Sequence, residues 1–390
     1  MSGIAERTVQ HDFGRLPDLA ARRAGGSVVC ASDELFAAKE NLIESGPPSF
    51  AAATFGHKGQ IYDGWETRRR RSAGHDWAII RLGLPGVVSG VVVDTAFFTG
   101  NYPPEISVEG CGVEGYPDPA ELAAADWLSL MPRAAVAGDT ANEFEVSVSC
   151  RVTHVRLRIY PDGGVARLRV HGRAVPDPRL LRGSLVDIAA LANGARVTGC
   201  SNMFYSSPSN LIWPGEARNM GEGWETARRR DDVNDWVEIK LAGPGRIRLA
   251  ELDTSYFVGN APGWATLTGH LPGLAGAPGP VGQRDEVELL RRTRLQPDTR
   301  HRFRIEGDAE VTGARLDVYP DGGMARLRLP AELTAAAREQ LALRWFNLLP
   351  QAQAAAVLAA AGDARGTVLG ARPLSSVTEL PPALQAQLGG

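Results

Sequence analysis

A stretch of 39 residues occurs twice in the chain, and this internal repeat constrains the fold more than any other feature of the sequence. Residues 63–101 align with residues 222–260 without a gap, and 18 of the 39 aligned positions are identical. The same offset of 159 residues (222 − 63) relates residues 160–164 to residues 319–323, both Tyr-Pro-Asp-Gly-Gly. Self-similarity of this kind indicates two copies of one domain.

The two copies differ in length near their beginnings. Ser32 matches Ser201 at an offset of 169 (201 − 32), whereas the offset is 159 from Asp63 onward. The first copy therefore carries ten extra residues (169 − 159) between positions 44 and 62, where glycine and proline indicate a loop. Because only one copy has this loop, we expect one of the two copies to be functionally specialised.

Composition excludes several classes of protein. The 390 residues suffice for two cores of ordinary size, and 44% hydrophobic with 22% charged residues is typical of a globular chain. The net charge of −3 gives no reason to expect a nucleic acid or an acidic membrane surface as partner. The four cysteines are scattered without a Cys-x-x-Cys pair, and residues 1–10 lack the pattern of a secretion signal. We therefore expect a cytoplasmic protein that binds neither nucleic acid nor membrane.

The pattern of apolar residues indicates β-strands in both copies. Apolar and polar side chains alternate in residues 236–241, 154–160 and 166–170, which is the period of a half-buried strand. The Pro-Asp-Gly-Gly segment between the last two runs predicts a tight hairpin. Many short strands with glycine and proline turns favour a sandwich or jelly roll. We expect an all-β fold of two tandem jelly-roll or β-sandwich domains.

The expected domain boundaries follow from the repeat and from changes in composition. We predict an N-terminal lead-in (1–26), a first repeat (27–174), a second repeat (175–330) and a C-terminal segment (331–390). Alanine, leucine, arginine and glutamate after Pro330 favour helices in that segment, and its end from residue 371 is expected to be loose. A short helix at 185–192 is expected to lead into the second copy.

The repeated stretch is rich in side chains that can bind or transform a small polar molecule. In the first copy these are Asp63, Glu66, Asp76 and Asp94, the run Arg68–Arg71, His75 and Asn101. A guanidinium group offers a planar fork of donors that suits a carboxylate. Successive side chains on a strand point to opposite faces, so at most alternate arginines can share a site. A purely structural interpretation, with the charges paired at the rim of the sandwich, stays open.

His75 belongs to the first copy alone, since Asn234 occupies the equivalent position. Histidine is a natural proton donor near neutral pH, although a lone histidine before a strand is usually only a polar residue. A metal site could use His57, His75 and nearby carboxylates, but no His-x-x-x-His spacing is present. The sequence therefore requires no cofactor, and it leaves open a divalent metal such as Mn²⁺.

These motifs together resemble those of the allantoicase family over roughly residues 15–350. The resemblance lies in residues 31–36, 40–43, 63–71, 75–77, 93–95 and 98–104, and in Ser201-Asn202, Asn210-Leu211, Gly223–Thr226 and Asp253-Thr254 of the second copy. It implies two jelly-roll domains of the galactose-binding-like type. It also implies hydrolysis of allantoate to ureidoglycolate and urea, a step of purine catabolism.

Allantoate carries a carboxylate and two ureido groups, and its hydrolysis needs an acid for the departing urea and a base for water. We expect Glu66 and Asp94 to act as acceptor or base, and His75 as the acid. The expected substrate-binding residues are Arg68, Arg70, Arg71 and Asn101, together with Glu225, Arg228 and Asp253 of the second copy. Whether the second copy serves the same cleft, a second site or only the structure stays open.

Two other functions are compatible with the sequence. Sandwich folds often bind sugars through aromatic, acidic and amide side chains in end loops, so a non-catalytic module for a small polar ligand or a carbohydrate is the first alternative. The second is a paralogue that keeps the fold without the activity. We expect a homo-oligomer in either case.

Overall fold

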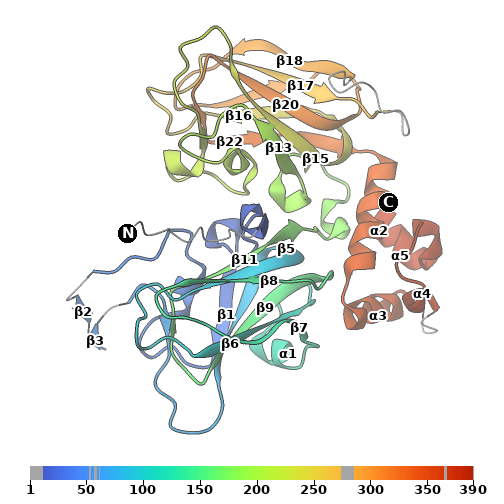
Figure 1. Cartoon of the computed structure of the whole chain (residues 1–390). Helices are drawn as coiled ribbons and strands as arrows, with labels where there is room; N and C mark the ends of the chain where they lie inside the picture. Colours follow the sequence, from blue (N-terminus) through green and yellow to red (C-terminus); the bar gives the residue numbers. More distant parts are fainter. Residues whose placement is uncertain are drawn as a thin grey trace, which may run out of the picture. The chain divides into compact units, whose positions relative to one another are not determined.

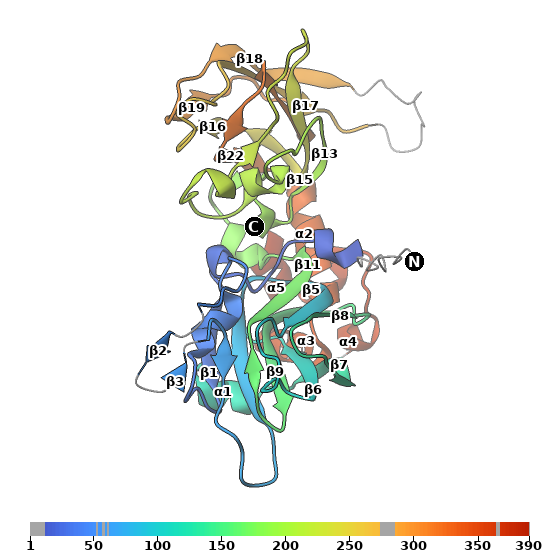
Figure 2. The same cartoon turned by 60° about the vertical axis from the view of Figure 1, so that its left-hand side comes forward.

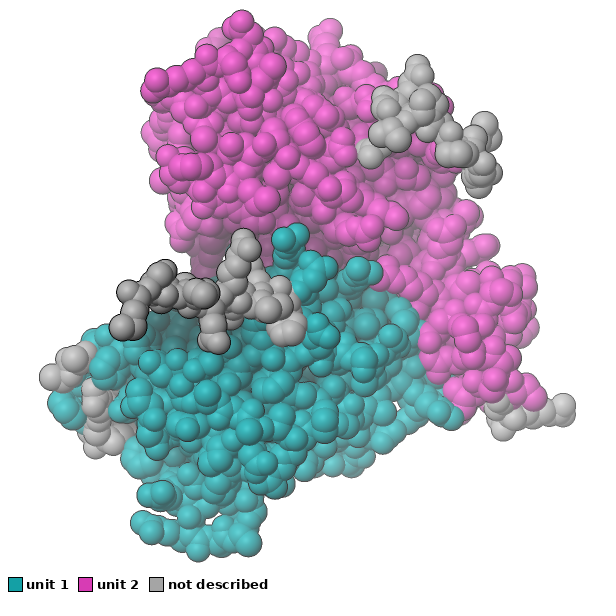
Figure 3. Space-filling model, viewed as in Figure 1, with its two compact units in different colours: residues 1–175, 348–357 teal, residues 176–347, 358–390 magenta. Residues whose placement is uncertain are grey.

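The computed structural model describes residues 12–51, 54–56, 59–60, 62–273, 285–363 and 367–389. The chain forms two compact units, one of residues 1–175 with 348–357 and the other of residues 176–347 with 358–390 (Figure 3). Each unit contains one copy of the repeat, folded as a curled antiparallel β-sheet. The predicted fold class, tandem jelly-roll domains followed by a helical segment, is confirmed. No helix in the described part is long and apolar enough to cross a membrane.

The first unit is built around one long strand. Its strands are β1 (Ser27–Ala31), β2 (Phe55–Gly56), β3 (Gly59–Gln60), β4 (Trp65–Glu66), β5 (Asp76–Asp94), β6 (Glu105–Cys111), β7 (Leu128–Ala135), β8 (Ala141–Glu145), β9 (Arg151–Tyr160), β10 (Gly164–Val165) and β11 (Arg167–Ala174). The main sheet has the order β1-β5-β9-β6-β7 (Figure 2). The first part of β5 pairs with β1 and β9, and its second part pairs with β8 and β11. This single strand therefore joins the two sides of the curled sheet.

The second unit repeats this arrangement with shorter strands. They are β12 (Val186–Asp187), β13 (Arg196–Cys200), β14 (Trp224–Glu225), β15 (Asp235–Ile247), β16 (Leu249–Asp253), β17 (Trp264–His270), β18 (Glu286–Arg294), β19 (Arg300–Arg304), β20 (Val311–Tyr319), β21 (Gly323–Met324), β22 (Arg326–Arg328) and β23 (Pro330–Leu333). The larger sheet runs β12-β23-β15-β20-β17-β18, and β19-β16-β22 form a separate sheet. Figure 1 labels β15, β20, β17 and β18 of the larger sheet. The helix expected at 185–192 is wrong, because β12 and a 3₁₀ turn (Leu191–Asn193) occupy that stretch.

The tight hairpin predicted at residues 160–164 is also wrong. β9 and β11 do not pair with each other, since each pairs with β5. The turn between them instead bonds to other segments: β10 pairs with β4, and the backbone N–H of Gly164 donates to the carbonyl of Asn101 at 2.8 Å. The repeated Pro-Asp-Gly-Gly motif thus holds β4, and with it Glu66, against the body of the sandwich.

In the described residues, α-helices occur at one place in the first unit and in the C-terminal segment. They are α1 (Pro119–Ala123), α2 (Ala335–Leu348), α3 (Gln351–Ala360), α4 (Thr367–Gly370) and α5 (Pro382–Gly389). The prediction of a loose tail from residue 371 is wrong, because Leu374, Leu380, Leu384 and Leu388 are buried. The described part of the expected lead-in, residues 12–26, packs against the first unit, since Leu19 and Ala20 are fully buried.

One phenylalanine lies at the same place in the core of each unit. Phe98 and Phe257 are buried at 1% and 0% exposure, and each ring lies against a glycine that pairs with the glutamate of β4 or β14. A Cβ atom on Gly164 would overlap the ring of Phe98, and one on Gly323 would overlap the ring of Phe257. Glycine is required at these two positions because the ring fills the space of a side chain.

Replacing Gly164 by alanine tests this packing. We expect Gly164→Ala to lower the free energy of unfolding by about 1–3 kcal/mol, because overpacking shifts a buried ring. Gly100→Ala is the matched control, since no atom lies within 4 Å of the Cβ that it would add. That variant should change stability by no more than about 0.5 kcal/mol. Thermal unfolding followed by circular dichroism gives both values, and equal effects would contradict the packing argument.

Candidate active site

The four consecutive arginines of the first copy line a pocket of about 400 Å³. The pocket lies between β4 and β5 beside the end of β1, and its lining consists of Ser32, Asp33, Arg68, Arg69, Arg70, Arg71, Ser72 and Asp76. The structure thus brings together the three arginines predicted to bind substrate. It also brings in Ser32, Asp33, Arg69 and Ser72, which the sequence had not singled out as ligands.

One wall of the pocket is held by the carboxylate of Asp33. Trp65 is fully buried, and its indole Nε1 donates to the carbonyl of Asp33 at 2.8 Å. The Asp33 carboxylate accepts hydrogen bonds from the backbone N–H of Arg68 at 2.8 Å and from its Nε at 2.6 Å. A buried tryptophan therefore fixes an aspartate, which in turn fixes the first arginine of the run.

The floor of the pocket is an ion pair between Arg70 and Asp76. Arg70 Nη1 lies 2.8 Å from Asp76 Oδ1, and the hydroxyl of Ser32 donates to the same oxygen at 3.0 Å. Asp76 is only 2% exposed, and its other oxygen, Oδ2, has no hydrogen-bond partner among the described residues. Asp235 Oδ2 in the second copy also has no partner among the described residues, so this oxygen is a shared feature of the two copies.

The remaining two arginines are available to a ligand. Arg69 and Arg71 are exposed, and neither forms an ion pair within the part of the chain that the structure describes. Over the eight lining positions and the next residue, Ala73, the first copy carries four arginines and two aspartates, a charge of +2 (4 − 2). This excess of positive charge suits a small anion.

The equivalent positions of the second copy carry less positive charge. Ala227 replaces Arg68 and Asn202 replaces Asp33, so the second copy lacks both members of this ion pair. Asp231 replaces Ser72 and lies 2.8 Å from Arg229, which also pairs with buried Asp235 at 2.8 Å. The eight positions equivalent to the lining carry a charge of +1 (3 − 2), and with Asp232 the charge is zero (3 − 3). The first copy is therefore the better suited of the two to bind an anion here.

Glu66 and Asn101 form a hydrogen-bonded pair next to this pocket in the chain. Asn101 Nδ2 donates to Glu66 Oε1 at 2.7 Å, and burial raises the pKa of Glu66 above 4.5. The second copy has the same pair, in which Asn260 Nδ2 donates to Glu225 Oε1 at 2.5 Å. Trp65 and Thr67 are buried, whereas Glu66 is half-buried and Arg68 is exposed, so these two side chains share the outer side of the segment.

The lining of the arginine pocket contains none of Glu66, Asn101, His75 and Asp94. The ring of His75 lies 5.0 Å from that of Tyr160. Burial, together with the nearby charges of Arg158 and Arg70, lowers the pKa of His75. The role of His75 as the acid stays a prediction. Asp94 ends β5, where its Oδ1 accepts a hydrogen bond from the backbone N–H of Ala96 at 2.8 Å.

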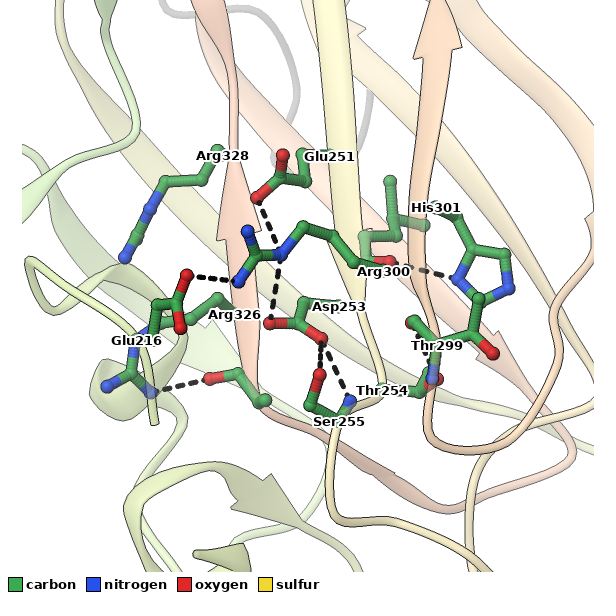
Figure 4. Close-up of polar contacts among 12 residues, drawn as sticks. Glu216, Glu251, Asp253, Thr254, Ser255, Thr299, Arg300, His301, Arg326 and Arg328 are labelled. Atoms are coloured by element: carbon green, nitrogen blue, oxygen red, sulfur yellow. Dashed lines mark hydrogen bonds and ion pairs between the residues drawn. The ribbon is translucent and has the colours of Figure 1, made fainter. Parts of the chain in front are cut away.

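Asp253, predicted to bind substrate, belongs to an ion network in the second unit (Figure 4). Its Oδ1 accepts hydrogen bonds from the backbone N–H and the hydroxyl of Ser255, and Arg300 lies 3.8 Å from its Oδ2. Arg300 also pairs with Glu216 at 2.6 Å and with Glu251 at 3.5 Å. These contacts connect β16 to β19 and to the loop before β14, so they serve the structure. Arg228, by contrast, is exposed.

A metal centre is not evident in the described residues. They contain no group of three or more histidine, cysteine or acidic side chains placed to hold an ion. His57, considered above as a ligand, lies outside the described residues. The arginine pocket itself offers cations and two carboxylates that are already paired with arginine, which is a donor set suited to an anion.

The chain is similar to known proteins over most of its length. The family model described as the allantoicase repeat matches residues 17–175 and 186–334. A probable allantoicase of Nocardia farcinica is 58% identical over 332 residues, covering 84% of this chain and 98% of that protein. One of Streptomyces avermitilis is 50% identical over 355 residues, covering 88% and 92%. The crystal structure of allantoicase from Saccharomyces cerevisiae is similar with a TM-score of 0.67 at 32% identity, covering 82% of this chain and 94% of that one.

The charge difference between the copies can be tested by exchanging one residue. Ser72→Asp should place a carboxylate next to Arg70, as Asp231 lies next to Arg229 in the second copy, and it should lower the positive charge of the pocket. We expect the dissociation constant for malonate, measured by calorimetry at low salt, to rise about tenfold, equivalent to about 1.4 kcal/mol. The reciprocal variant, Asp231→Ser, removes a carboxylate from the second copy and should strengthen any malonate binding there. If Ser72→Asp leaves malonate binding unchanged, the proposed effect of this charge difference is wrong.

Proposed function

The chain belongs to the allantoicase family, and from this premise we propose that it hydrolyses allantoate to ureidoglycolate and urea at the arginine pocket of its first unit. The location is supported by the charge of the lining positions, which is +2 (4 − 2) in the first copy and +1 (3 − 2) at the equivalent positions of the second. Allantoate is a monoanion, so its carboxylate is stabilised more in the first copy. The second copy then serves mainly as structure.

The pocket offers two kinds of arginine to this substrate. Asp33 and Asp76 hold the guanidinium groups of Arg68 and Arg70, which therefore act as fixed donors. Arg69 and Arg71 have no such carboxylate among the described residues, so they are the groups proposed to bind the substrate carboxylate. Fixed donors lose little entropy on binding, and free guanidinium groups supply the charge.

Glu66 is the residue proposed to transfer the proton. Hydrolysis adds a hydroxyl to the central carbon and returns one proton of water to the departing urea nitrogen. A single carboxylate can take the proton from water and give it to the urea nitrogen, with no net change in its own charge. The raised pKa of Glu66 makes it a stronger base than an ordinary glutamate, and the hydrogen bond from Asn101 orients it. His75 and Asp94 are left as positioning residues.

The assignment of the arginines is tested by a pair of equivalent variants. We expect Arg71→Ala to lower kcat/KM for allantoate by about 10- to 100-fold, because it removes a charge-assisted hydrogen bond to the substrate. Arg230→Ala changes the equivalent arginine of the second copy and should leave kcat/KM within about twofold. Urea release measured at several allantoate concentrations gives both values. Equal losses in the two variants would place the chemistry in both copies.

The role of Glu66 predicts a dependence on pH. The active form is the carboxylate, so kcat/KM should fall as the pH is lowered through the pKa of Glu66, which lies above 4.5. Glu66→Gln should abolish activity, whereas Glu225→Gln should retain it. A raised carboxyl pKa means that the charge destabilises the folded state above that pKa. Glu66→Gln should therefore keep or raise the melting temperature at neutral pH, which excludes unfolding as the cause of lost activity.

The alternative function is binding of a ligand without catalysis. Measuring urea release from allantoate distinguishes this function from hydrolysis. The purified protein should release urea from allantoate, and incubation with and without Mn²⁺ tests a metal requirement. Absence of urea under both conditions would leave a ligand-binding function for the pocket. Saturable binding of allantoate without turnover would then identify that function directly.

We also propose that the protein is a homo-oligomer of the cytoplasm. All four cysteines are free thiols, which is typical of a reducing compartment. Met203, Phe204 and Tyr205 are 64%, 69% and 65% exposed, and a run of large apolar side chains at a surface often marks an interface.

A further inference from the structure

A larger cavity, of about 910 Å³, lies in the second unit. Its walls come from β15, β17 and β20 and from the first turns of α2, which lies next to β15 in Figure 1. Helix α2 begins after residue 334, where the match to the allantoicase repeat ends. The cavity is therefore formed jointly by the second repeat and by a segment outside the repeat, and it shares no residue with the arginine pocket.

The polar groups of this cavity have counterparts in the first copy. Lys240 and Thr312 correspond to Arg81 and Thr153 at the offset of 159. The imidazole is present in both copies but comes from opposite strands. In the first copy His154 of β9 faces Cys111 of β6, and in the second copy the equivalents are reversed, with His270 of β17 facing Gly313 of β20. A cation, a hydroxyl and an imidazole thus recur at one place in the fold.

The first copy closes over this group. His154 is 1% exposed, and burial lowers its pKa to about 4. Leu122 of α1 packs with Cys111 and covers this side, together with the partly buried Trp127. The side chain of Gln353 fills the space beside Gly112 and donates to Glu114 at 2.8 Å. The second copy has Leu271 and Gly273 in place of Gly112 and Glu114, and there Lys240, His270 and Thr312 are among the residues that line the cavity.

The chemistry of the lining indicates the kind of ligand. One part is apolar, contributed by Leu241, Leu271, Pro272, Ala337 and Leu341. The basic groups are Lys240, His270 and Arg344. Among the described lining residues the carboxylate is Asp285, and Glu286 Oε1 lies 3.7 Å from His270 Nε2. The volume lies within the range of about 300–1,000 Å³ that is usual for small-molecule sites, and a mainly apolar lining with a few polar groups is typical of them. Allantoate has no apolar part and does not match this lining.

We propose that this cavity is a binding site for a small organic acid that has one carboxylate and an apolar body. Lys240 and Arg344 bind the carboxylate, with Thr312 as a neutral donor, and the leucine and proline side chains contact the body. The site is independent of the proposed hydrolysis of allantoate, since the two pockets have no residue in common. Its ligand is of a different class from the substrate.

Binding of hexanoate to the full chain tests this proposal. Calorimetry and ligand-observed NMR should show saturable binding of hexanoate, and hexanamide, which has the same body without the charge, should bind at least about tenfold more weakly. Lys240→Met and Arg344→Met should each weaken hexanoate binding about tenfold, because each removes one cation from the carboxylate. Arg81→Met, the equivalent change in the first copy, and Arg71→Ala in the arginine pocket should leave hexanoate binding unchanged.

Three results would overturn the proposal. They are the absence of saturable hexanoate binding, equal binding of hexanoate and hexanamide, and loss of binding in Arg71→Ala with none in Lys240→Met. The last result would mean that hexanoate occupies the arginine pocket. None of these measurements uses urea release, so a failure of the proposed hydrolysis and a failure of this site are distinguishable.

Discussion

A buried aspartate at the start of the longest strand of each unit holds the arginine segment in place. Asp76 and Asp235 are 2% and 0% exposed, and each lies 2.8 Å from an arginine and within hydrogen-bond distance of a serine hydroxyl. A buried carboxylate is tolerated only where such partners satisfy it, so the arginine cannot leave its position without a large cost. The charged residues that distinguish the arginine segments of the two copies lie around this shared ion pair.

The two copies share one fold and differ in a few charged residues around the arginine segment. Both copies keep the buried pair, the glutamate–asparagine pair and the phenylalanine that lies against two glycines. The first copy adds a cation at Arg68 with Asp33 to hold it, and the second adds Asp231 and Asp232, which remove the excess charge. The same fold therefore presents a more positive surface in the first copy than in the second.

The alternation of apolar and polar residues predicted the fold class, and the constant offset of 159 residues predicted the two copies of one domain. Both features can be read from a single sequence. They did not predict strand pairing, and the false hairpin at residues 160–164 shows why. The Pro-Asp-Gly-Gly motif has the residues of a tight turn, but its bonds go to β4 and to Asn101, which are distant in the sequence. The arginine pocket was predicted in part. Asp33 was missed, although its joint change with Arg68 to Asn202 and Ala227 was visible in the printed sequence.

The first unit is not one continuous piece of chain. Residues 348–357 return to it after the whole second repeat, and Gln353 of α3 then bonds to Glu114, which also binds the buried Arg151. A fragment that stops at residue 175 would lack the side chain that completes this contact. The first unit therefore contains contacts that can form only once the chain through residue 357 is present.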